Sequence, residues 1–118
     1  MIDIVAKIGF IFCNLINHCS SDLTETDLKE ILPILLYLEE NNNFEASLLL
    51  ANYHDPGGCI FNNKIDDSLD NYIKAWTHYA KAIKITKNGV SDREKHVFKH
   101  FSNELKAFEL ATGKKINF

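Results

Sequence analysis

The hydrophobic positions of this 118-residue chain recur three and four places apart along most of its length. That spacing is typical of amphipathic helices, because it gathers apolar side chains on one face of each helix. No segment reads as a convincing strand, although the final "INF" is compatible with an extended tail. The pattern predicts an all-α fold, a compact bundle of about five helices over residues 2–17, 23–41, 44–53, 68–86 and 91–112.

Residues that break or cap helices mark the expected boundaries. The asparagine run 41–43 predicts a turn, and "HDPGG" ends the third helix because proline cannot continue it and the glycines permit a reversal. Pro33 interrupts the second helix, since proline lacks an N–H and clashes with the preceding turn. We therefore expect either two kinked segments or two short helices there.

The last predicted helix has the clearest signals. Ser91 and Glu94 form an S-x-x-E capping box, in which each side chain accepts a free backbone N–H of the first turn. Gly113 marks the expected end of this helix. Between these points one apolar stripe runs along the helix, formed by Val97, Phe98, Phe101, Leu105 and Phe108.

The fourth helix, "DNYIKAWTHYAKAI", places alanines among large aromatic rings. Alanine lets a neighbouring helix approach closely, while the rings fill the grooves on either side. We expect Ala75 and Ala82 to face the helix 44–53 at short range. The two segments would then form a helix hairpin.

The stretch "ASLLLANYHDPG" followed by "NYIKAWTHYAKA" resembles one degenerate SEL-like repeat, a tetratricopeptide-type pair of antiparallel helices, over about residues 46–82. The resemblance implies a binding scaffold and not a catalyst, in a family whose bacterial members include adaptors, regulators and toxin-neutralising proteins. The long loop between the helices carries Phe61 on one edge of the hairpin, where insertions in repeats often bind partners. The matching positions are Ala46, Leu50, Ala51, Gly57, Lys74, Ala75, Tyr79, Lys81 and Ala82.

Composition predicts one helical domain over residues 1–118, with 46% hydrophobic and 25% charged residues. Cys13, Cys19 and Cys59 are an odd number without metal-site spacing, which favours reduced thiols. Lys7 followed by "IGFIFCNLI" imitates a secretory signal, but Asp3 precedes it, no cleavage site follows, and the apolar run is too short to span a membrane. We expect a buried first helix in a cytoplasmic protein.

The net charge of −3 hides an asymmetry between the two parts of the chain. Residues 1–50 carry eight acidic side chains and two lysines, whereas residues 51–118 carry eight acidic side chains against ten lysines and Arg93. Such a distribution either steers a partner of opposite charge or reflects ordinary solvated helix faces. The negative net charge and scattered lysines argue against nucleic-acid binding.

Catalytic patterns are weak. His96 and His100 share a helix face, but "HVFKH" lacks the glutamate of a zinc-binding H-E-x-x-H motif, and no third ligand is indicated. Arg93 and His100 have the loose R-x-x-x-x-x-x-H spacing that resembles HEPN ribonucleases, where such a pair would stabilise and protonate a scissile phosphate. Cys59 and His54 lack an orienting third group. We expect no metal, no cofactor and no enzymatic activity.

The sequence therefore predicts a non-enzymatic protein-binding module, in its most concrete form a bacterial immunity protein that blocks a basic, nuclease-type toxin. Alternatives are a HEPN-like ribonuclease using Arg93 and His100, and a regulatory adaptor. An acidic surface around the second helix would attract the toxin, and large rings would anchor it. The predicted partner-binding residues are Glu39, Glu40, Glu45, Tyr53 and Phe61.

Overall fold

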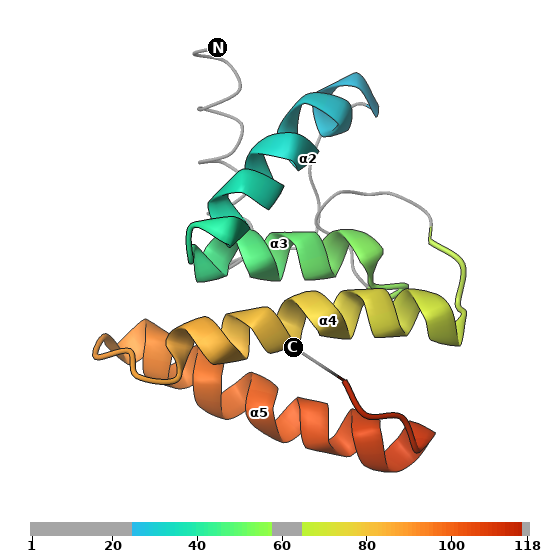
Figure 1. The fold of residues 1–118 in the computed structure, drawn as a ribbon. Helices are drawn as coiled ribbons and strands as arrows, with labels where there is room; N and C mark the ends of the chain where they lie inside the picture. Colours follow the sequence, from blue (N-terminus) through green and yellow to red (C-terminus); the bar gives the residue numbers. More distant parts are fainter. Residues whose placement is uncertain (1–24, 58–64, 117–118) are drawn as a thin grey trace.

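The computed structural model describes residues 25–57 and 65–116 of the chain. These ranges form four helices and no strand: α2 (Glu25–Glu40), α3 (Phe44–His54), α4 (Leu69–Thr86) and α5 (Asp92–Thr112) (Figure 1). The all-α prediction is confirmed, and four expected helices lie within a residue or two of their predicted bounds. The first expected helix, residues 2–17, lies outside the described residues.

Helix α2 is continuous through Pro33, so the alternative of two short helices is wrong. The ring of Pro33 is exposed to solvent, whereas Ile31 and Leu35 on the opposite face are completely buried against α3. Proline removes one hydrogen bond from the helix. Burial of the apolar face offsets that loss and keeps the helix intact on both sides of the proline.

The predicted asparagine turn joins α2 to α3. Asn42 has a φ of 64°, in the left-handed region that asparagine tolerates better than most residues. Asn43 caps α3, and its side chain accepts a hydrogen bond of 3.0 Å from the Ala46 N–H. The asparagines therefore supply both the reversal and the start of the next helix.

The four helices stack in chain order, α2 on α3, α3 on α4 and α4 on α5, running back and forth in turn (Figure 1). Among the described helices, each backbone closely approaches only the helices next to it in sequence. The core is correspondingly divided into clusters between neighbours. One cluster joins α2 and α3, a second spans α3, α4 and the start of α5, and a third joins α4, α5 and the C-terminal tail.

The alanines of α4 pack where the sequence places them. Ala75 and Ala82 are completely buried and share a cluster with Leu48 and Ala51 of α3. Trp76 and Tyr79 flank this contact, with ring centroids 4.8 Å apart. The close approach of α3 and α4 is thus explained by small residues at the contact and rings beside it.

Both ends of α5 agree with the sequence. The Ser91–Glu94 capping box is complete, and Gly113 ends the helix with a φ of 68°, a left-handed conformation that glycine adopts without strain. Gly89 in the preceding turn lies so close to Glu94 that an added Cβ would come within 2.5 Å of that side chain. In the predicted apolar stripe Val97 and Leu105 are buried and the three phenylalanines pack around them.

Candidate functional site

A buried carboxylate at the end of α2 holds the most closely connected polar cluster. Glu39 is only 6% exposed. Its Oε2 lies 2.7 Å from His78 Nδ1, and its Oε1 accepts a hydrogen bond of 3.1 Å from Lys81 Nζ. Both partners belong to α4, so Glu39 ties α2 to a helix that its backbone does not approach.

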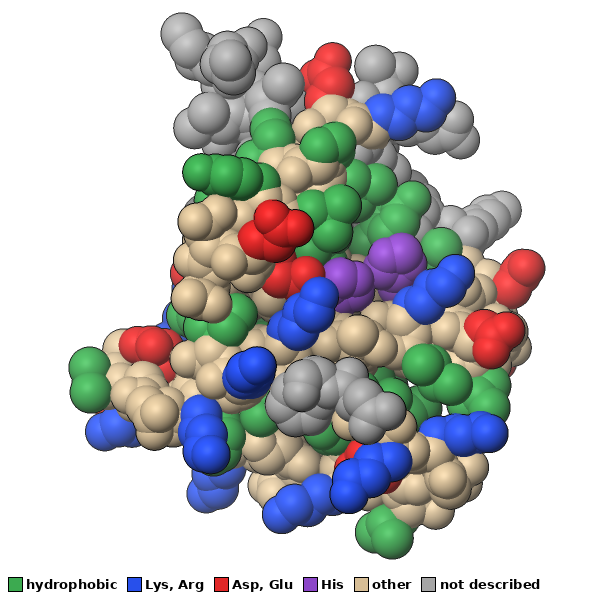
Figure 2. Space-filling model, viewed as in Figure 1, with side chains coloured by type: hydrophobic (Ala, Val, Ile, Leu, Met, Phe, Trp, Pro, Cys, Tyr) green, Lys and Arg blue, Asp and Glu red, His purple; other side chains and the backbone are tan. Residues whose placement is uncertain are grey.

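The aromatic and acidic residues at the end of α3 complete this cluster. The His54 ring stacks on the His78 ring, with centroids 5.5 Å apart and planes 5° from parallel. Beside them Asp55 accepts a hydrogen bond of 3.0 Å from the Tyr79 hydroxyl. Figure 2 shows histidine side chains near the centre of one face of the molecule, with acidic and lysine side chains close by.

Burial and neighbouring charges shift the ionisation of the cluster. Burial opposes ionisation of Glu39, but hydrogen bonds and attraction from His78, together with Lys81, outweigh it and lower the pKa of Glu39. Burial lowers the pKa of His54, because the charged form of histidine is the protonated one, and repulsion from His78 and Lys74 lowers it further. The buried Ser47 Oγ makes no well-formed hydrogen bond in the described part of the chain, and contributes least to the Glu39 shift.

The contacts of this cluster connect α2 to α4. A carboxylate that orients a histidine is part of many acid–base sites. Within residues 25–57 and 65–116, however, no serine or threonine hydroxyl is hydrogen-bonded to His78. The His78 and Lys81 contacts instead neutralise the carboxylate that α2 buries.

The predicted partner-binding residues are not equivalent in the structure. Glu40 is exposed, and Tyr53 is half-buried against the α2–α3 cluster. Glu45 pairs with Arg93 of α5 at 3.3 Å. The expectation that Glu39 belongs to an accessible acidic surface is wrong, because its carboxylate is buried and already paired. Phe61 lies outside the described residues.

The residues of the ribonuclease alternative lie on one face of α5. Arg93 is held by Glu45 and lies over the Phe44 ring, 5.8 Å from its centroid. His100 stacks on His96, with centroids 5.8 Å apart, and contacts the edge of Phe101. No group of three or more metal-ligating side chains occurs among the described residues. Cys59 of the weaker thiol pairing falls in a part of the chain that is not described.

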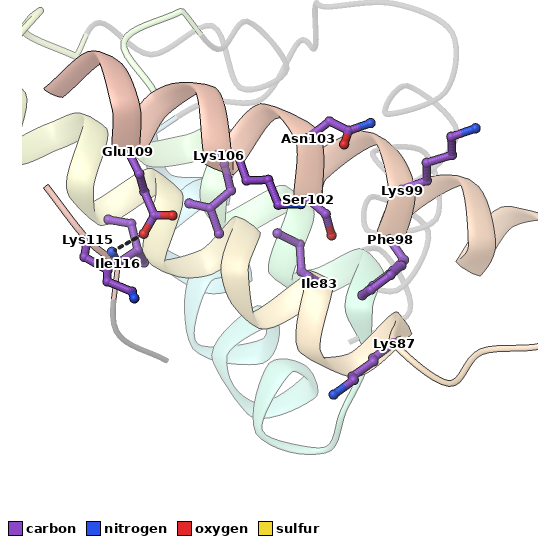
Figure 3. A pocket seen from close by; sticks show the side chains of 11 residues that line it. Ile83, Lys87, Phe98, Lys99, Ser102, Asn103, Lys106, Glu109, Lys115 and Ile116 are labelled. Atoms are coloured by element: carbon purple, nitrogen blue, oxygen red, sulfur yellow. Dashed lines mark hydrogen bonds between the residues drawn. The ribbon is translucent and has the colours of Figure 1, made fainter. Parts of the chain in front are cut away.

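A pocket of about 570 Å³ lies between the end of α4, α5 and the C-terminal tail (Figure 3). Ile83, Phe98, Leu105 and Ile116 contribute its apolar surface. The tail is attached by Glu109, whose Oε2 accepts a hydrogen bond of 2.9 Å from the Ile116 N–H. The lining also includes four lysines, Lys87, Lys99, Lys106 and Lys115, of which Lys99 points away from the apolar side chains in Figure 3.

Sequence reasoning missed this pocket. The seven-residue spacing of Lys99 and Lys106, which puts both on one helix face, was the available signal. The docking of Ile116 had no local signal, because it also requires α4, where Ala80 and Ile83 of the same cluster lie more than a whole helix earlier in the sequence.

Comparison with protein-family models, curated proteins and solved structures finds no match. The SEL-like resemblance therefore stays a prediction from the sequence. Of the helices in the described segments, none is long and apolar enough to cross a bilayer.

Proposed function

We propose that this chain is a non-catalytic helical protein-binding module. The observation that supports the proposal best is the stacking of helices in chain order, each against its sequence neighbours. Proteins built in this way expose long side surfaces and commonly use them to bind other macromolecules. Polar contacts also join helices that are not neighbours in the stack. Glu39 supplies one between α2 and α4, and Glu45 with Arg93 supplies another between α3 and α5.

The most concrete form of the proposal is a bacterial immunity protein that binds a toxin in a one-to-one complex. Support comes from the small size of the chain, its uneven charge and the class of protein that the SEL-like resemblance implies. A regulatory adaptor would use the same kind of surface. The two differ in whether the partner is toxic when the chain is absent.

The test uses the polypeptide encoded beside this gene, expressed with and without this chain. An immunity protein should restore growth that the neighbouring polypeptide arrests, and the two should purify as a one-to-one complex. A complex with a harmless partner would instead favour an adaptor. Growth arrest that persists despite full-length, folded chain would contradict the immunity proposal.

The ribonuclease alternative requires a separate measurement. Purified chain and its His100→Ala variant should both leave a labelled RNA intact if the chain is non-catalytic. The Arg93 guanidinium is already engaged by Glu45 and Phe44, which argues against a free phosphate-binding role. Metal-independent cleavage that the variant loses would overturn the proposal.

A further inference from the structure

We propose that the pocket between α4, α5 and the C-terminal tail binds a partner segment that carries a large apolar side chain flanked by carboxylates. This inference rests on the proposed protein-binding function. It assigns the binding site to the lysine-bearing end of the molecule, away from the acidic residues around α2. The pocket of about 570 Å³ is within the usual range for small binding sites.

The floor of the pocket is apolar and firmly held. Ile83, Leu105 and Ile116 are each less than a tenth exposed and belong to one cluster, and Phe98 packs against it. A side chain entering the pocket would therefore meet a preformed surface and would not need to open the core. Such a surface is suited to one large aliphatic or aromatic side chain, which gains most from leaving water.

The rim of the pocket is positively charged. None of its four lysines forms an ion pair with another described residue. Among the described lining residues Glu109 is the one acidic side chain, and its Oε2 accepts a hydrogen bond from the Ile116 N–H, so one negative charge stands against the charges of the lysines. The charge around the opening thus favours an anionic occupant and repels a basic one.

The spacing of the lysines favours a peptide over other anions. Lys99 and Lys106 are seven residues apart on α5, which corresponds to about 10 Å along the helix axis. An extended peptide covers that distance in about three residues, so two of its carboxylates would reach both lysines. A fatty acid has a single carboxylate. A nucleic-acid strand needs stacking rings, and among the described lining residues Phe98 is the one aromatic side chain.

The experiment measures fluorescence anisotropy of a labelled peptide, acetyl-Glu-Glu-Leu-Phe-Glu-Glu-amide, titrated with the full chain. We expect saturable binding that weakens with salt, because the rim contacts are ionic and exposed. Two matched peptides, one with Lys in place of every Glu and one with Ser in place of Leu and Phe, should bind at least about tenfold more weakly, a difference of about 1.4 kcal/mol.

Paired variants locate the site. Lys99→Glu with Lys106→Glu should weaken binding of the acidic peptide about tenfold or more. Lys74→Glu with Lys95→Glu changes the net charge equally at exposed positions outside the pocket and should leave binding nearly unchanged. Equal losses in the two double variants would show that only net charge matters and would overturn the proposed site.

Two other ligands and the partner protein test the choice of an acidic peptide as the occupant. Hexathymidylate or dodecanoate binding more tightly than the acidic peptide would overturn the peptide assignment in favour of a nucleic acid or a lipid. A one-to-one complex with the partner protein that survives Lys99→Glu and Lys106→Glu unchanged would overturn the pocket as the docking site, while leaving the protein-binding function intact. Loss of that complex in the same variant, but not in the control, supports both.

Discussion

At the scale of single residues, the Glu39 carboxylate joins three helices with very few atoms. It lies on α2 and contacts His78 and Lys81 on α4, and His78 in turn stacks on His54 of α3. A buried charge is tolerated only when it is paired and hydrogen-bonded. Removing one member of such a cluster therefore costs more than the net value of the contacts it makes.

Glu39→Gln should lower the free energy of unfolding by about 1–3 kcal/mol, because an uncharged amide cannot balance Lys81 or accept the same hydrogen bonds. The adjacent Glu40→Gln is a matched control at an exposed position, and its effect should stay within about 0.5 kcal/mol. Urea denaturation measures both. Equal midpoints for the two variants would contradict the buried pairing.

The lowered pKa of His54 predicts a dependence of stability on pH. Because the folded chain binds this proton less readily than the unfolded chain, the contribution of His54 is fully present above its ordinary pKa of 6.5 and is lost as pH falls through the lower folded value. The stability of the native chain relative to His54→Gln should therefore decrease on acidification below about pH 6.5. A difference that stays constant with pH would contradict this.

The contribution of Glu39 to stability also decreases on acidification, but at lower pH than that of His54. Its stabilising contribution is present above the ordinary value of 4.5 and is lost as pH falls toward the lowered folded pKa. The difference in unfolding free energy between the native chain and Glu39→Gln should thus narrow below about pH 4.5. Denaturation measured across this range separates the Glu39 effect from that of His54.

At the scale of helices, the α3–α4 contact depends on the small size of the residues between them. Ala51, Ala75 and Ala82 are all completely buried there. Protein interiors leave little free volume, so an added side chain must displace its neighbours. The hairpin should therefore be more sensitive to enlargement at this contact than to loss of charge on its outer face.

Ala82→Leu should overpack the α3–α4 contact and lower the unfolding free energy by about 1–3 kcal/mol. Lys84→Leu introduces the same side chain at an exposed position of α4 and serves as the control. Chemical denaturation with an unchanged m-value would assign the difference to stability alone. An unchanged midpoint for Ala82→Leu would show that the helices can separate at little cost.

At the scale of the whole molecule, charge is distributed unevenly along the stack. Exposed carboxylates such as Glu30 and Glu40 lie on α2, whereas the lysines of the pocket lie just after α4, on α5 and in the tail. The two ends of the stack would therefore attract partners of opposite charge. A basic toxin would dock at the acidic end on α2, whereas an acidic partner segment would dock at the lysine-bearing end with the pocket.

Association with the proposed partner distinguishes the two ends. If a basic toxin docks on α2, Glu30→Lys with Glu40→Lys should slow association and reduce its salt dependence, without involving the buried Glu39. Asp66→Lys with Glu104→Lys changes the charge equally at exposed positions elsewhere. Surface-immobilised binding at low and high salt measures the rates. An association rate that both pairs leave unchanged would rule out the α2 carboxylates as the docking face.

The sequence by itself determined the helices and their boundaries in the described segments. Caps and turns act through neighbours within four residues, so Asn43, the Ser91–Glu94 box and Gly113 could be read directly. The burial of Ala75 and Ala82 was also predictable, because periodicity and small size mark a contact face. The alternative of two short helices at Pro33 was wrong, because the effect of a proline on a helix depends on which face of that helix is buried.

Only the tertiary structure decided which polar residues are available to a partner. Glu39 and Glu40 are adjacent and chemically alike in sequence, yet one is buried between His78 and Lys81 and the other is exposed. The pocket likewise requires α4, α5 and Ile116 to meet in space. Both outcomes depend on contacts between residues far apart in the chain, and the packing of whole helices, not the local pattern, decides which distant residues meet.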